Sequence, residues 1–372
     1  MMRYNERYQA LNKCFEMGRS STIDNSNIEI QFYNFDSNIS GEEENKLLQY
    51  TDNKISENFS FKYPVFAPRN NKKYDKAILL LHGLNERSWN KYLTWAEYLC
   101  THTQRPVIMF PIAYHINRGP MEWSNPRKMV DTLNNRKEKY CDDRSISYAN
   151  VALSDRLSEH PSRFYLSGRQ TLLDLSQLFE EIKDGKHPLF ASGTDINIFT
   201  YSIGSFLAQI SLMSNHNNLF EKSKLFMFCG GSIFSSMFGV SRSILDNHSF
   251  SKLQNYYINM FGNEDIAIWK QDNIFNSFSK MITPDKWKQE RHTFFNSIKN
   301  RIRGVSLSKD VVIPYHGVQE AMGTETTTAS IQLQDFPFSY SHENPFPHNE
   351  KDTTSLNKAF EGVFSDAIEF LG

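Results

Sequence analysis

Hydrophobic and polar positions follow two different rhythms along the chain. In residues 27–35 (NIEIQFYNF) and 58–66 (NFSFKYPVF), apolar side chains alternate with polar ones. A period of two is typical of a half-buried strand. We therefore predict an antiparallel strand hairpin inside an N-terminal extension, residues 1–74, whose first 58 residues carry no other element-length pattern.

After this extension, continuous apolar runs alternate with helix-length amphipathic segments. Residues 76–83 (KAILLLHG) and 105–112 (RPVIMFPI) are apolar throughout, and residues 90–100 between them have helical spacing. This order predicts a βαβ unit with parallel strands. A helix with Ser167 as its N-cap and Gly185 as its stop is predicted next, followed by further strands within residues 224–231, 302–314 and 330–340.

Two segments interrupt this alternation. Residues 116–165 are rich in Asn, Arg, Asp and Ser, and residues 236–300 are helical in pattern and rich in aromatic side chains. Insertions that follow parallel strands lie over the edge where such sheets bind ligands. We predict an α/β fold with a mainly parallel sheet, helices on both faces, a core formed by residues 75–235 and 301–372, and two insertions, one lid-like and one a helical cap.

The amino-acid composition indicates which kinds of molecule the protein binds and where in the cell it is found. The 41 basic residues nearly balance the 42 acidic ones, which argues against a nucleic-acid or membrane surface and favours a small-molecule substrate. The start of the chain has no apolar core of signal-peptide length, so we expect a cytoplasmic protein. The cysteines lie far apart, without zinc spacing, and favour free thiols and no metal; their even number leaves a periplasmic location open.

The stretch NIFTYSIGSFLAQ (197–209) places a serine where an apolar strand becomes an apolar helix. A sharp strand-to-helix turn exposes a serine hydroxyl beyond the sheet edge and aims the following helix N-terminus at it. The usual pattern is G-x-S-x-G, whereas here Thr200 replaces the first glycine before Ser202 and Gly204. The alternative reading is a serine that caps a buried helix.

A reactive serine needs two N–H donors for the developing oxyanion. The amide of Ile203, directly after the serine, is one candidate. The second is expected after an early strand, where the His82-Gly83 turn offers the Leu84 amide, or less favourably that of Asn85. We interpret His82 itself as a structural histidine that holds this loop, because it precedes the serine in the chain.

The remaining partners of the serine are an acid and a base. Asp310 follows a strand directly and precedes a Val-Val-Ile-Pro turn, so it can stand beside the serine and orient a histidine, or it can simply cap a turn. His342 lies in a proline-restrained loop after the last strand and is the predicted base. His348 is its competitor, further along and past Pro347.

In chain order, serine, acid and histidine match the α/β-hydrolase superfamily. Residues 75–372 resemble that superfamily through His82-Gly83-Leu84, the Ser-Ile-Gly turn, the Lys-Asp-Val-Val-Ile-Pro turn and the Ser-His-Glu-Asn-Pro loop. The resemblance implies a serine hydrolase with Ser202, Asp310 and His342 as its triad and no cofactor. Thr200 is the departure, and it puts the geometry of the turn in question.

The predicted substrate is a small carboxylic ester. Arg118 and Trp123 lie in the insertion that follows the second strand of the core, near the expected pocket rim, where Arg118 either binds a substrate carboxylate or is an ordinary loop arginine. The aromatic residues of 236–300 either line an acyl pocket or form the core of the cap. Acyl transfer, peptide cleavage and a non-catalytic binding role remain as alternatives.

Overall fold

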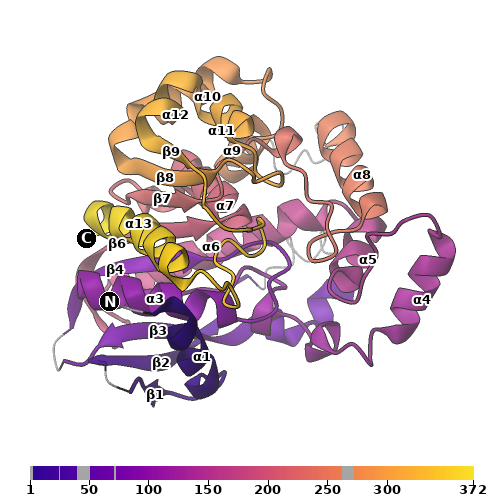
Figure 1. Cartoon of the computed structure of the whole chain (residues 1–372). Coiled ribbons are helices and arrows are strands. Elements are labelled where there is room, and N and C mark those ends of the chain that lie inside the picture. The colour runs from indigo at the N-terminus through magenta and orange to yellow at the C-terminus, as the bar shows by residue number, and fades with distance from the viewer. Residues whose placement is uncertain (1–2, 25, 40–50, 71–72, 262–271) are drawn as a thin grey trace.

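A computed structural model describes residues 3–24, 26–39, 51–70, 73–261 and 272–372. Its strands form one sheet in the order β1-β2-β3-β5-β4-β6-β7-β8-β9 (Figure 1). The strands are β1 (Ser21–Thr22), β2 (Ile28–Asp36), β3 (Ser60–Pro68), β4 (Tyr74–Leu81), β5 (Val107–Met109), β6 (Phe190–Tyr201), β7 (Leu225–Phe228), β8 (Ile302–Leu307) and β9 (Ile331–Gln334).

The sheet is parallel from β5 to β9 and antiparallel at its N-terminal edge. β2 and β3 form the predicted antiparallel pair, and β3 then pairs with β5. The N-terminal strands are therefore an edge of the main sheet, because the backbone groups of β3 are hydrogen-bonded on both sides.

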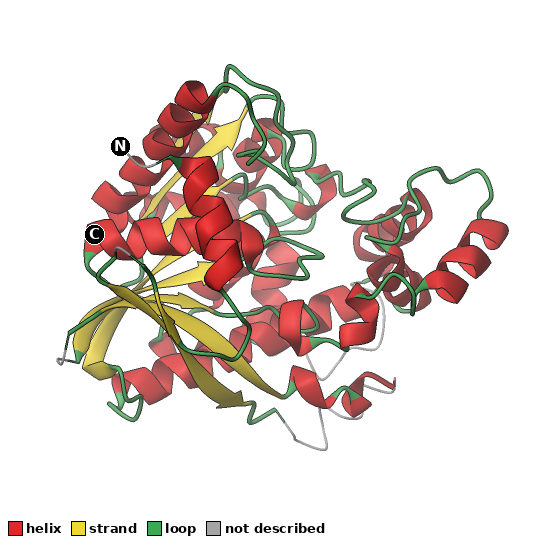
Figure 2. Ribbon diagram, turned by 60° about the horizontal axis from the view of Figure 1, so that its bottom comes forward, coloured by secondary structure: helices red, strands yellow, loops and turns green. Residues whose placement is uncertain are grey.

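Helices cover both faces of the sheet, as Figure 2 shows with red helices on either side of the yellow strands. The helices are α1 (Tyr4–Cys14), α3 (Asn90–Thr103), α4 (Val130–Lys139), α5 (Val151–Glu159), α6 (Arg163–Lys183), α7 (Ile203–Ser214), α8 (Asn247–Asn255), a π-helix (Tyr256–Met260), α9 (Asn273–Lys280), α10 (Lys288–Ser297), α11 (Tyr315–Met322), α12 (Thr324–Ser330) and α13 (Thr353–Leu371). The predicted α/β class, with a mainly parallel sheet, is confirmed.

Two hydrophobic cores lie on opposite faces of the sheet. Successive side chains of β4 alternate between them: Leu79 packs with α6 and α7, while Ile78 and Leu80 pack with α1, α3 and α13. A strand buried on both faces reads as a continuous apolar run, which is why residues 76–83 showed no alternation.

Both insertions contain helices. Residues 116–165 hold α4 and α5, and residues 236–300 hold α8, the π-helix, α9 and α10, while 262–271 lie outside the described residues. Figure 1 shows α4, α5 and α8 together on one side of the sheet, and α5 contacts α8. Over the described residues, no helix combines the length and the apolar character needed to cross a bilayer.

The predicted start of α6 is wrong. The helix begins at Arg163, so Ser167 lies inside it, where its hydroxyl donates a hydrogen bond to the carbonyl of Ala113 at 2.9 Å. The extra turn is stabilised by tertiary packing, because Tyr165 meets Phe278 of α9 with ring centroids 4.9 Å apart. The predicted stop is close to the observed one, since α6 ends at Lys183 and Gly185 has a φ of +70°.

Candidate active site

Ser202 occupies the turn between β6 and α7. Its φ of 56° and ψ of −124° are strained for a residue with a side chain. β6 ends at Tyr201 and α7 begins at Ile203, so one residue makes the whole turn. The hydroxyl therefore stands at the carboxyl edge of the parallel sheet, beside the positive end of the α7 dipole.

Close packing around the turn explains the small residue after the serine. A Cβ on Gly204 would come within 2.8 Å of the carbonyl oxygens of Leu81 and His82. A Cβ on Gly230 would come within 2.0 Å of the Ser205 hydroxyl. The turn is thus wedged between the ends of β4 and β7, where only glycine fits.

Thr200 is accommodated without loss of the turn. Its side chain is fully buried, and its hydroxyl donates to the carbonyl of Phe226 at 3.1 Å. The Ser205 hydroxyl lies 2.8 Å away and supplies the second hydrogen bond. Because both polar atoms find partners, the threonine costs little in this buried strand.

His342 and Asp310 complete a chain of hydrogen bonds from Ser202. The Ser202 hydroxyl lies 2.7 Å from His342 Nε2, and His342 Nδ1 lies 2.7 Å from Asp310 Oδ2. All three side chains are buried, with exposed fractions of 5%, 5% and 4%. In this arrangement Nδ1 carries the proton and Nε2 is free to accept one from the serine.

The second oxygen of Asp310 is held by backbone amides. Oδ1 accepts hydrogen bonds from the N–H groups of Val312 and Ile313, each at 2.9 Å. Asp310 therefore both caps its turn and orients His342, so the two readings of this residue describe one structure. The Cys229 thiol also bonds Asp310, and burial raises the pKa of that thiol well above its usual value.

Tyr201, beside the serine, anchors the histidine loop and was missed by sequence reasoning. Its hydroxyl donates to the carbonyl oxygen of His342, and its ring stacks on the imidazole at 5.5 Å between centroids. A tyrosine next to a candidate nucleophile was the available signal. The competing histidine lies elsewhere, because His348 is exposed and stacks on Tyr8.

The loop after β4 is held in place by Tyr92. The Gly83 amide donates to the Tyr92 hydroxyl at 2.9 Å, and that hydroxyl donates to Glu86 at 2.7 Å. Within the described part of the chain, the amides of Leu84 and Ile203 have no protein acceptor. Two N–H groups without partners near Ser202 are what an oxyanion requires.

His82 is a structural residue of this loop. One ring nitrogen, Nδ1, donates to the carbonyl of Gly83 at 2.8 Å, and Nε2 accepts from the amide of Ile112 at 2.9 Å. Burial lowers its pKa to about 4, so the imidazole is neutral near pH 7. Both nitrogens are occupied by backbone groups, which leaves no basic atom for catalysis.

The prediction that Arg118 binds a substrate carboxylate is wrong. Its side chain is fully buried and donates to Asp174 at 2.6 Å, while further N–H groups bind the carbonyls of Asn58 and Pro111. A guanidinium with this set of partners is a packing element of the core. Burial also lowers its pKa, although the carboxylate of Asp174 opposes that shift.

Trp123 lies outside the pocket of Ser202. It covers Gly119 and stacks against Arg156, whose guanidinium carbon is 4.3 Å from the ring centroid. It lines a neighbouring pocket that shares Asn85, Glu86 and Arg87 with the pocket of Ser202. Substrate binding by Trp123 therefore stays a prediction. It requires a substrate large enough to fill both pockets.

Both insertions reach the pocket of Ser202. The Asn85 side chain donates to the carbonyl of Ala149 at 2.6 Å and to that of Ser243 at 2.7 Å, joining the two insertions at the loop that follows β4. Ala149, Ser243 and Ile244 line the pocket together with Ser202 and His342. Over the described residues, no cluster of three or more His, Cys, Asp or Glu side chains is placed to hold a metal ion.

Several solved esterases are similar to this chain. A hyperthermophilic esterase from the archaeon Pyrobaculum calidifontis shares 10% identity at a TM-score of 0.46, over 98% of this chain and 90% of that chain. A bacterial heroin esterase shares 8% identity at a TM-score of 0.49, over 99% and 90%. Such low identities transfer no activity, so the α/β-hydrolase fold rests on the parallel sheet and the serine turn described above.

Among curated proteins, none matches the chain significantly. Residues 38–372 do match a protein family described as a family of unknown function, DUF6051. The matched region includes the serine turn, the Asp310 turn and the His342 loop. The chain belongs to the DUF6051 family.

Proposed function

We propose that this protein is a serine hydrolase that cleaves carboxylic esters. Ser202 attacks the ester carbonyl while Nε2 of His342 takes its proton, and Asp310 holds the imidazole in the required tautomer. The amides of Leu84 and Ile203 stabilise the oxyanion. His342 returns the proton to the leaving alcohol, and water then releases the acid from the acyl-enzyme. The scheme uses no metal or organic cofactor.

One observation carries this proposal. The Ser202 hydroxyl, His342 and Asp310 form a continuous hydrogen-bonded chain with both heavy-atom distances at 2.7 Å. The serine also has strained backbone dihedrals that a merely structural serine does not need. Geometry of this kind is the physical signature of nucleophilic catalysis.

The insertions are proposed as a cap over this site. They contribute Ala149, Ser243 and Ile244 to the pocket wall, and the Asn85 bridge ties them to the oxyanion loop. A cap of this kind limits the access of water and selects substrates by shape. The four free thiols fit the reducing compartment, the cytoplasm, that we propose as the location.

Hydrolysis of p-nitrophenyl esters tests the proposal. We expect equal amounts of free acid and alcohol, a product ratio unchanged by an added alcohol or amine, and no turnover by the Ser202→Ala variant. Products joined to the added acceptor would show that the triad serves acyl transfer. Ester cleavage that persists in Ser202→Ala would contradict the assignment of the nucleophile.

A further inference from the structure

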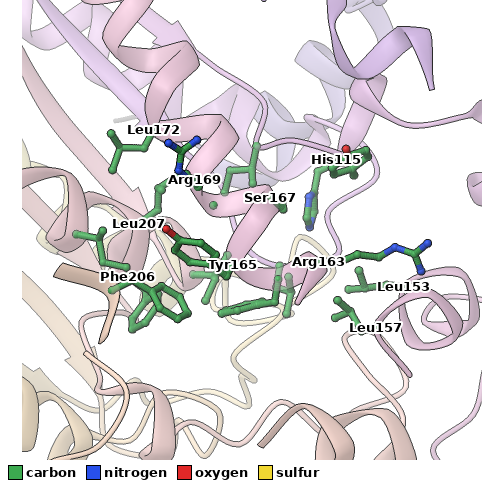
Figure 3. Close-up of a pocket in the computed structure, with 18 of the residues that line it drawn as sticks. His115, Leu153, Leu157, Arg163, Tyr165, Ser167, Arg169, Leu172, Phe206 and Leu207 are labelled. Atoms are coloured by element: carbon green, nitrogen blue, oxygen red, sulfur yellow. The ribbon is translucent and has the colours of Figure 1, made fainter. Parts of the chain in front are cut away.

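A second apolar cavity lies behind the oxyanion residues. It is lined by residues of α5, α6, α7 and α9. Figure 3 shows Leu153 and Leu157 of α5 on one side, Phe206 and Leu207 of α7 on the other, and α6 between them. Its lining is almost wholly apolar, as is usual for pockets that hold small organic ligands. We refer to it as the chamber.

The chamber adjoins the candidate nucleophile through shared walls. A smaller apolar cavity is lined by Ser202 and by residues of the second insertion, among them Phe250. Leu84, Phe164 and Ile203 line both cavities. The two cavities therefore adjoin at these three side chains, so the acyl part of an ester bound at Ser202 lies next to the chamber.

The chamber has a polar end at His115 and Tyr114. Nδ1 of His115 donates to the carbonyl of Ala113 at 2.9 Å, which leaves Nε2 as a hydrogen-bond acceptor. Nε2 of His115 and the Tyr114 hydroxyl have no hydrogen-bond partner among the described residues. These side chains are only 7% and 8% exposed. Buried polar atoms of native proteins normally have hydrogen-bond partners, so we expect a ligand to supply the partner of these two atoms.

The polar end favours a neutral hydroxyl over a charged group. Burial lowers the pKa of His115 to about 3, so the ring offers a neutral acceptor near pH 7. The three arginines that line the chamber are already paired: Arg156 and Arg163 both bind Asp52, and Arg169 binds Asp272. A ligand hydroxyl can donate to His115 Nε2 and exchange a hydrogen bond with the Tyr114 hydroxyl.

We propose that the chamber binds the acyl part of the substrate and that the substrate class is an ester whose apolar acyl chain carries a hydroxyl group remote from the carbonyl. This inference rests on the proposed esterase function. The apolar walls select the chain, and His115 with Tyr114 selects the hydroxyl.

Filling the chamber tests its role. Gly168 of α6 lines the chamber, and a Cβ there would meet no heavy atom of the described residues within 4 Å. Gly168→Leu therefore places a side chain in open space and improves helix propensity. Gly362→Leu on the exposed face of α13 is the matched control, because Gly362 is equally open and far from the chamber.

Turnover is measured on p-nitrophenyl esters from acetate to palmitate. We expect Gly168→Leu to lower kcat/KM for the long esters by about tenfold or more while the acetate ester is little affected, since a blocked pocket discriminates by chain length. The control variant should keep the wild-type profile. An unchanged chain-length profile in Gly168→Leu would overturn the acyl assignment.

The hydroxyl is tested by binding to the Ser202→Ala protein, using ω-hydroxydodecanoic acid and dodecanoic acid as probes in titration calorimetry. We expect the hydroxy acid to bind about tenfold more tightly. Adding His115→Asn, which keeps a donor for the Ala113 carbonyl but removes the Nε2 acceptor, should abolish this preference. His115→Gln, which restores an acceptor near Nε2, should recover part of it.

The outcomes separate this inference from the proposed function. If Ser202 turns over no ester and takes up no fluorophosphonate, the esterase proposal fails. If Ser202 is reactive but the two acids bind equally, or their ratio is unaltered by His115→Asn, the hydroxyl selection is wrong. If the ratio changes as expected and Gly168→Leu shortens the preferred chain, the substrate class stands.

Discussion

The triad at the carboxyl edge of the sheet and the polar side chains of the chamber are both buried, but they differ in whether their polar atoms have hydrogen-bond partners. At the edge, Ser202, His342 and Asp310 are connected to one another and to backbone amides without a gap. In the chamber, His115 and Tyr114 each keep a polar atom that has no partner in the part of the chain that the structure describes. The first arrangement is complete before any ligand binds, as preorganised catalytic groups require. The second becomes complete only with a ligand.

The hydrogen-bond partners of Arg118 show why it is not a binding residue. The sequence placed Arg118 near the rim of the expected pocket, yet its guanidinium donates to Asp174, Asn58 and Pro111. A charged group with that many partners offers nothing to a substrate. Unpartnered atoms, and not charge or position alone, indicate where a ligand is expected.

Loss of the base should have the largest effect. We expect His342→Ala to lower kcat by about 10⁴-fold or more, because proton transfer from the serine is lost, in line with other triads. His348→Ala should leave kcat close to that of the wild type, since His348 is exposed and stacks on Tyr8. Steady-state ester hydrolysis measures both, and equal losses would show that the wrong histidine was assigned.

Breaking the buried ion pair should affect stability and not chemistry. Asp174→Ala leaves the fully buried guanidinium of Arg118 without its carboxylate, which should lower the free energy of unfolding by about 3–5 kcal/mol. Urea denaturation measures the loss. KM for esters of the folded variant should be unchanged, whereas a raised KM at constant stability would restore Arg118 as a substrate ligand.

Acid should destabilise the fold through the buried histidines. The pKa of His115 is lowered to about 3 in the folded protein, so between pH 6.5 and about 3 the unfolded chain binds a proton that the folded chain does not. Stability attributable to His115 is thus present above pH 6.5 and decreases as the pH falls, by about 1.4 kcal/mol per pH unit.

His115→Asn isolates this contribution from that of other groups. Its unfolding free energy, measured by urea titration between pH 7 and pH 4.5, should depend less steeply on pH than that of the wild type. Identical slopes for the two proteins would contradict the neutral, buried state of His115 on which the chamber's acceptor depends. Binding of a hydroxylated ligand should raise the stability of the wild type by a similar amount across this range, because His115 is already neutral in the folded protein.

Tyr201→Phe should have the smallest effect. It removes the hydrogen bond to the carbonyl of His342 but keeps the stacked ring, so we expect a loss of about 1 kcal/mol in stability and a modest fall in kcat. Thermal unfolding and ester hydrolysis test this expectation. A fall in kcat as large as that of His342→Ala would mean that Tyr201 takes part in the chemistry directly.

The sequence was sufficient to predict the core strands and the order of the candidate catalytic residues along the chain. Apolar runs located the core strands, and the spacing of Ser202, Asp310 and His342 at strand ends selected the three residues that the structure brings together. Ser202 directly follows β6, Asp310 lies in the turn after β8, and His342 lies in the loop after β9. Parallel strands place their carboxyl ends along one edge.

Contacts between segments that are distant in the sequence could not be predicted from local sequence patterns. Asp174 pairs with Arg118 from the middle of α6, and nothing in either residue's neighbourhood signals the other. The early start of α6 depends on Tyr165 meeting Phe278, and the chamber exists only where α5, α6, α7 and α9 pack around it. Such features follow from tertiary packing, which overrides local propensity.

The most direct test of the central claim is labelling by a fluorophosphonate probe, with the modified peptide identified by mass spectrometry. The account predicts one adduct, on Ser202, that disappears in Ser202→Ala, is strongly reduced in His342→Ala and persists in His348→Ala. An unlabelled native protein, or an adduct on a different serine, would contradict the claim that these three side chains form a working nucleophile.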